Sequence, residues 1–104
     1  MSEACIHAGV AYLAGQVPET AGAGIEQQTA EVLKEIDALL AKAGSDKTRI
    51  LRAQVYLADI TDFDGMNRAW DAWVAPGAAP ARATVEARLA DPGWKVEIVV
   101  TAAV

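Results

Sequence analysis

Apolar and polar residues alternate along two segments near the C-terminus. In residues 84–89, valine, alanine and leucine alternate with threonine, glutamate and arginine, and in residues 95–100, valine and isoleucine occupy every second position. A period of two predicts half-buried strands. The sequence Asp-Pro-Gly at residues 91–93 favours a turn. We therefore expect a β-hairpin or a closely spaced strand pair here.

Two shorter strands are expected at the N-terminus, over residues 5–7 and 10–17, with Pro18 ending the second. Cys5 and His7 would share one face of the first strand. A metal site needs further soft ligands, so a packed or solvated pair is the alternative. Gly15 interrupts the second strand, which indicates either a bulge or tight sheet packing, or a place where a backbone or a ligand approaches closely.

Helical periodicity follows over residues 25–43, where apolar residues recur every three or four positions. Lys42 in the last turn and Gly44 just beyond it predict the end of this helix. Residues 50–57 form a further apolar alternation, which predicts a strand with Leu51 and the alternate positions up to Leu57 on one side.

A second helix is expected to start at Thr61 or Asp62, with Asp64 completing a capping box from Thr61. Its inner stripe consists of apolar and aromatic residues: Phe63, Met66, Trp70, Trp73 and Val74. Asn67 lies on the same stripe. A buried amide must find partners, so it either ties down a neighbouring backbone segment or positions something in a pocket.

The expected order of elements is strand, strand, helix, strand, helix, strand, strand. Residues 1–104 suffice for one domain. Two helices cover only one face of such a sheet, which predicts a two-layer α+β domain with a mixed β-sheet. Because little chain remains to hide the other face, we expect another copy of the chain to cover it.

Composition excludes several classes of function. The net charge is −5, and no cluster of Lys and Arg is available to neutralise phosphates, so nucleic acid is not an expected partner. The lone cysteine excludes an internal disulfide, and no motif supplies enough ligands for a metal. No signal peptide or long apolar run is present, so we expect a cytoplasmic protein with no membrane contact.

Two charged residues lie where a strand pair seldom tolerates them. Arg82 enters the first C-terminal strand directly after Pro80 and Ala81, and Glu97 interrupts the apolar run of the second. Charges at a period of two are usually the solvated side of a sheet. The alternative interpretation is a functional site that contains both residues.

The residues also resemble those of the Rid family, known earlier as YjgF/YER057c/UK114. The resemblance covers nearly the whole chain and depends on the runs YLAGQVP, RILRAQVYLADITDF, MNRAWDAWV, PARATVEARL and KVEIVVTAA. It implies a chorismate-mutase-like fold and homotrimers whose sheets pack inside, with three clefts between subunits. It also implies hydrolysis of reactive 2-imino acids, the tautomers of enamines such as 2-aminoacrylate, to 2-keto acids and ammonia without a cofactor.

The resemblance implies a role for several residues. Arg82 matches the arginine that binds the substrate carboxylate, which a planar guanidinium suits. Glu97 matches the glutamate that orients and activates the attacking water. Gly15 matches a glycine whose backbone lines the cleft, and Asn67 matches an asparagine near the same pocket.

Three departures from the family pattern bear on substrate range. Thr84 occupies the position that carries cysteine in many deaminating members, and Ala14 replaces a serine; both remain candidate substrate-binding residues. The family's N-terminal tyrosine has no counterpart, since the chain begins at Met1.

Two classes of function therefore remain open. The first is an enamine/imine deaminase, and the second is a non-catalytic protein of the same fold that binds or responds to 2-keto acids. Ribonuclease activity or inhibition of translation is associated with the family by its older names, but the acidic composition argues against it.

Overall fold

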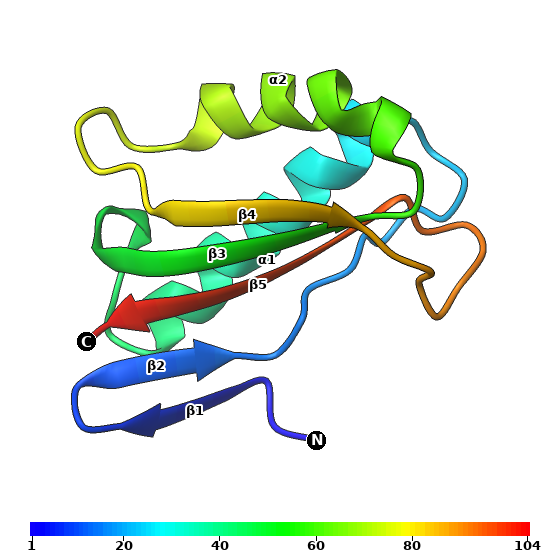
Figure 1. Cartoon of the computed structure of the whole chain (residues 1–104). Helices are drawn as coiled ribbons and strands as arrows, with labels where there is room; N and C mark the ends of the chain where they lie inside the picture. The colour runs from blue at the N-terminus through cyan, green and yellow to red at the C-terminus, as the bar shows by residue number, and fades with distance from the viewer.

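The computed structural model describes residues 1–104, which form one five-stranded sheet with the strand order β1-β2-β5-β3-β4 (Figure 1). The strands are β1 (Ala4–His7), β2 (Val10–Leu13), β3 (Ile50–Leu57), β4 (Ala81–Glu86) and β5 (Val96–Ala103). β3 and β4 run parallel, and the other three pairings are antiparallel. The expectation of a mixed sheet is confirmed.

Two α-helices, α1 (Ile25–Lys42) and α2 (Phe63–Trp73), pack on the same face of this sheet (Figure 1). Short 3₁₀ turns, η1 (Lys47–Arg49) and η2 (Ile60–Asp62), precede β3 and α2. Neither α-helix combines the length and the apolarity that a membrane crossing requires. The predicted two-layer α+β architecture is therefore correct, with one sheet face covered by helices and the other, the open face, left uncovered by the chain.

The hydrophobic core fills the space between the helices and the sheet. Val96, Ile98 and Val100 of β5 are buried in it, as the period of two predicts. The predicted inner stripe of α1 is buried as well, including Val32, Leu33, Ile36, Leu39 and Leu40. This helix ends as expected, because Gly44 adopts a left-handed conformation with a φ of 82° just beyond Lys42.

The predicted hairpin between the two C-terminal strands is wrong. β3 lies between β4 and β5 and pairs with both of them. β4 runs parallel to β3 because α2 forms the crossover between them, and residues 87–95 then lead past the end of β3 to β5 (Figure 1). An alternating pattern identifies a strand but does not identify its partners.

The polar side chains of β4 were expected on the solvated face of the sheet, but they lie on the face that the helices cover. Thr84 pairs with Val55, whose side chain faces the core, so Arg82, Thr84 and Glu86 all face the helix layer. Val85 faces the open side and is 45% exposed. This arrangement is possible because β4 is an edge strand, so its polar side chains lie at the border of the helix layer and not in the centre of the core.

Two local predictions are corrected as well. A bulge between Ile50 and Arg52 shifts the register of β3, so Leu51 is exposed while Ile50 is buried. The N-cap of α2, Asp62, makes no side-chain capping bond. Instead Asp59 accepts hydrogen bonds from the Thr61 amide and hydroxyl and caps η2.

The second N-terminal strand is shorter than predicted. β2 ends at Leu13, and Gln16 then forms an isolated bridge to Ile98 of β5. Both backbone hydrogen bonds of this bridge are present, from the Gln16 amide to the Ile98 carbonyl (2.9 Å) and in return (3.1 Å). Residues 14–16 are thereby held against β5 although they lie outside a regular strand.

Candidate functional site

Arg82 is half-buried at the edge of the sheet, between β4 and α2. The centre of its guanidinium lies 4.9 Å from the centroid of the Trp70 ring, a cation–π contact. Its Nη1 points to the Met66 sulfur at 3.8 Å. Both partners come from α2, one turn apart, and both are buried. The helix therefore provides a fixed surface against which the guanidinium lies.

No carboxylate of the chain pairs with Arg82. The one ion pair of the structure joins Arg68 to Glu26 on the surface. Burial lowers the pKa of Arg82 below its ordinary value, and the charge of Asp71 opposes part of that change. The guanidinium nevertheless stays charged, because arginine is not deprotonated in proteins. A half-buried cation without an anionic partner favours the binding of a carboxylate, which supplies the missing negative charge.

Glu97 lies on the open face of the sheet, as the second residue of β5. Its side chain covers the backbone of Gly15: a Cβ at residue 15 would overlap the Glu97 carboxylate, with the carboxylate carbon at 3.0 Å. The close approach expected at Gly15 therefore exists, and the approaching group is the side chain of Glu97. The bridge between Gln16 and Ile98 holds the two residues together.

The carboxylate of Glu97 has neither an ion pair nor a hydrogen bond within the chain. The residue is half-buried and lines a hollow of about 280 Å³ on the open face. The other lining residues are Tyr56, Ala87, Arg88, Leu89 and Val99. Within one chain, Glu97 therefore does not serve as half of a structural ion pair.

Arg82 and Glu97 lie on opposite faces of the sheet. Glu97 pairs with Tyr56 and Tyr56 with Val85, so Arg82 lies two strands away from Glu97 and three residues along. At about 4.8 Å between strands and 3.3 Å per residue, their Cα atoms are roughly 14 Å apart. A small substrate cannot contact both side chains of one chain.

Thr84 lies beside Arg82 on the same face of β4. Its hydroxyl oxygen is buried and has no hydrogen-bond partner. Asn67 is half-buried on α2, directly after Met66, and its side-chain amide makes no hydrogen bond to the protein. The interpretation that Asn67 ties down a neighbouring backbone segment is therefore wrong. Both side chains retain unused hydrogen-bonding groups, Thr84 on the same face of β4 as Arg82 and Asn67 next in sequence to Met66, which Arg82 contacts.

Ala14 belongs to the same segment as Gly15 and lies with Glu97, away from Arg82. Its amide donates to the Glu3 carbonyl (2.8 Å), and its own carbonyl accepts from the Gln16 side chain (2.9 Å). The sequence-predicted site residues thus fall into two groups. Arg82, Thr84 and Asn67 gather where β4 meets α2, and Ala14, Gly15 and Glu97 gather where residues 14–16 cross β5.

Cys5 and His7 share one face of β1, as expected. Both are exposed, and His7 pairs with Val10 while Cys5 pairs with Tyr12 on β2. No group of three or more potential metal ligands lies together anywhere in the chain.

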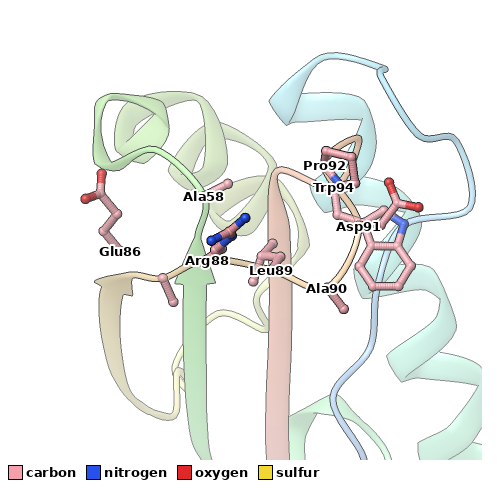
Figure 2. A pocket seen from close by; sticks show the side chains of 9 residues that line it. Ala58, Glu86, Arg88, Leu89, Ala90, Asp91, Pro92 and Trp94 are labelled. Atoms are coloured by element: carbon pink, nitrogen blue, oxygen red, sulfur yellow. The ribbon is translucent and has the colours of Figure 1, made fainter.

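The largest hollow of the chain contains none of the sequence-predicted site residues, although Ala87, Arg88 and Leu89 line both this hollow and the one beside Glu97. It has a volume of about 610 Å³ and lies in the loop after β4; among its lining residues are Glu86, Arg88, Asp91 and Trp94 (Figure 2). The Arg88 side chain lies between Glu86 on one side and Asp91 and Trp94 on the other. Glu86 accepts a hydrogen bond from the Ile60 amide and Asp91 one from the Gly93 amide, so both carboxylates have structural roles.

Sequence reasoning missed several neighbours of the two groups. It assigned Trp70 and Met66 to the core without relating them to Arg82, and it gave Tyr56 and Arg88 no role. The contact of Trp70 and Met66 with Arg82 depends on the α2 crossover that places this helix over β4. No local motif carries that information.

Comparisons with known proteins identify the family and the fold. A sequence model of the family described as Endoribonuclease L-PSP matches residues 1–104. A RutC family protein of Haemophilus ducreyi is 60% identical over 103 residues, which cover 99% of this chain and 88% of that protein. The RutC family protein YoaB of Escherichia coli is 52% identical over 103 residues, covering 99% of this chain and 90% of YoaB.

Solved structures show the same fold. A YjgF family protein of Neisseria meningitidis has a TM-score of 0.96 and 52% identity, covering 99% of this chain and 86% of that one. A Rid family protein of unknown function from Yersinia pestis has a TM-score of 0.93 and 34% identity over 100% of this chain and 87% of its own. The chain therefore belongs to the Rid family, the group also called YjgF or Endoribonuclease L-PSP.

Proposed function

We propose that the protein hydrolyses 2-imino acids to 2-keto acids and ammonia without a cofactor. The observation that carries the proposal is the half-buried guanidinium of Arg82, which has no carboxylate partner within the chain. A guanidinium can meet the two oxygens of a substrate carboxylate with two parallel N–H groups. Membership of the Rid family supports the choice of a small 2-imino acid as the substrate.

Thr84 and Asn67 complete the carboxylate end of the proposed site. The Thr84 hydroxyl and the Asn67 amide both lack protein partners; Thr84 follows Arg82 on the same face of β4, and Asn67 directly follows Met66, which Arg82 contacts. In the proposed complex, the ligand carboxylate bound to Arg82 accepts a hydrogen bond from the otherwise unpartnered Thr84 hydroxyl. Each such hydrogen bond to a charged group adds about 1.5–3 kcal/mol.

Glu97 supplies the base in the proposed reaction. A water molecule adds to C2 of the iminium, and its proton passes to the carboxylate of Glu97, which gives a carbinolamine. The proton then moves to the amine nitrogen, the regenerated Glu97 carboxylate takes the proton of the carbinolamine hydroxyl as the C–N bond breaks, and ammonia leaves as the keto group forms. General-base catalysis of this kind contributes on the order of 10²–10⁴-fold. Gly15 and Ala14 provide the backbone beside the reacting carbon.

The proposed site needs two copies of the chain. Because Arg82 and Glu97 of one chain face opposite ways, we infer that β4 of one subunit meets β5 and residues 14–16 of another. The open face carries exposed apolar residues such as Val85 and Tyr12, which a neighbouring subunit would cover. We propose a homotrimer with three such clefts, in line with the family resemblance.

A coupled assay, in which an amino-acid oxidase generates imines in the presence of the protein, tests the activity. The amount of oxidase is chosen so that imine is supplied at a constant rate. We expect keto acid to form faster than it does by spontaneous hydrolysis of the imine. The alternative function, a non-catalytic 2-keto acid binder, predicts thermal stabilisation by 2-oxobutanoate with no rate above background. Light scattering after gel filtration tests the trimer, and a monomer at micromolar concentration would contradict the shared site.

A further inference from the structure

Arg82 is held by contacts that leave most of its hydrogen-bond donors free. The guanidinium centre of Arg82 lies over the Trp70 ring, 4.9 Å from the ring centroid, and one Nη1 donor points to the Met66 sulfur. A guanidinium has five N–H groups in one plane, and the Met66 sulfur is the one hydrogen-bond partner that the structure gives Arg82. Its edge therefore remains available to a carboxylate.

The two contacting residues are themselves fixed. Met66 is fully buried and Trp70 is 5% exposed, and both lie on the inner side of α2. Trp70 also packs against Trp73 with ring centroids 5.4 Å apart, and the Trp73 indole donates to Asp37 of α1 at 3.0 Å. The ring under Arg82 is thus tied to both helices and does not move independently.

A free arginine side chain loses rotamer freedom when it binds a ligand, and that loss weakens binding. We propose that Trp70 is a positioning residue for Arg82: its ring fixes the guanidinium in advance, so that the carboxylate of a 2-keto or 2-imino acid binds without having to order it. This inference rests on the proposed function, because it takes Arg82 to be the carboxylate anchor. Trp70 acts through Arg82 and does not touch the substrate.

Two substitutions of Trp70 and one control separate positioning from stability. Trp70→Leu removes the aromatic face, whereas Trp70→Phe keeps an aromatic ring that a cation can lie against. Leu40→Ala serves as the control, because Leu40 is fully buried in α1, has no contact with Arg82, and its truncation lowers stability without changing the site.

Calorimetric titration with 2-oxobutanoate and imine kinetics measure the effect on binding. We expect Trp70→Leu to raise the Kd and the KM about 3- to 10-fold, with kcat close to wild type, because the carboxylate contact is the same in the ground state and the transition state. Trp70→Phe should recover a Kd within about twofold of wild type, and Leu40→Ala should leave the Kd unchanged. A Kd for Trp70→Leu equal to that of Leu40→Ala would overturn the inference.

A second readout does not depend on the ligand. In wild type, the Cδ protons of Arg82 next to the Trp70 ring should show upfield NMR shifts from the ring current, which Trp70→Leu abolishes and Leu40→Ala retains. Absence of these shifts in wild type would overturn the inference. If wild type showed the shifts but bound no 2-oxobutanoate, the proposed function would fail, while the placement of Arg82 by Trp70 would stand.

Discussion

Glycine at position 15 allows the Glu97 carboxylate to lie directly against the backbone, so Gly15→Ala tests whether that placement matters for turnover. A Cβ at this position would lie 3.0 Å from the carboxylate carbon and 3.3 Å from Cγ, whereas ordinary contacts begin at 3.4 Å. The nearer carboxylate oxygen overlaps the new atom and has to move by about 1 Å. The backbone itself is not strained, since Gly15 does not have a positive φ.

The substitution should separate stability from activity. Glu97 has no ion pair to lose, and replacing a glycine of ordinary backbone conformation raises stability by about 0.4–1 kcal/mol through the unfolded state. A general base displaced by about 1 Å loses on the order of 10²-fold in rate. We therefore expect unchanged or higher stability together with about a hundredfold lower kcat in the oxidase-coupled assay.

Gly24→Ala is the matched control. It makes the same chemical change at a glycine with a φ of −67° and no atom within 4 Å of the new Cβ. Its turnover should stay within about twofold of wild type, since nothing near it has to move. Full activity in Gly15→Ala would refute the role assigned to the Glu97 carboxylate. Loss of folding in Gly15→Ala but not in Gly24→Ala would show that residue 15 has a structural role instead.

Three further predictions concern other residues. Arg82→Lys should weaken 2-oxobutanoate binding at least about tenfold in calorimetry, because lysine offers a point charge in place of a planar pair of donors; wild-type affinity would exclude bidentate recognition. Thr84→Val should raise the free energy of unfolding by about 1–2 kcal/mol in urea, because the buried hydroxyl has no partner; a decrease would reveal a partner in the assembly. Hydrogen bonds from the Thr20 hydroxyl and amide lower the pKa of Glu31 below 4.5, so they stabilise the fold above that pH and lose effect as the pH falls through the lowered pKa. The melting temperatures of wild type and Thr20→Val should therefore converge below pH 4.5, and a constant difference would contradict this linkage.

Local patterns in the sequence predicted the elements well. The 3.6-residue period placed α1 to within one residue of its end, and the period of two located β5 and its buried positions Val96, Ile98 and Val100. These features depend on which side of one element is apolar, and that information lies within the element. The layer arrangement followed because two amphipathic helices cover only one face of a sheet.

Strand pairing and the faces of β4 could not be predicted in the same way. Alternation along β4 suggested a polar outer side, yet Arg82 and Thr84 face the helix layer because β4 is a parallel edge strand next to α2. The separation of Arg82 from Glu97 follows from that arrangement. Both residues were found as candidates by their unusual charge within a strand, but only the sheet register shows that one chain does not bring them together.

The central claim is that one active site takes Arg82 from one subunit and Glu97 from another, and mixed trimers of two inactive variants test it most directly. Arg82→Ala removes the anchor, and Glu97→Gln removes the base while it preserves shape. The two variants, carrying different affinity tags, are co-expressed, and trimers that contain both tags are purified and confirmed by native mass spectrometry.

In a randomly mixed population, a cleft is complete only when its Arg82 comes from a Glu97→Gln chain and its Glu97 comes from an Arg82→Ala chain. Each condition is met half of the time, so about a quarter of all clefts should be active in closed trimers, and somewhat more in trimers selected for both tags. Recovery of imine turnover to roughly that fraction of wild type, with each variant alone inactive, is the result that the shared site predicts. Mixed trimers as inactive as the parent variants would contradict it.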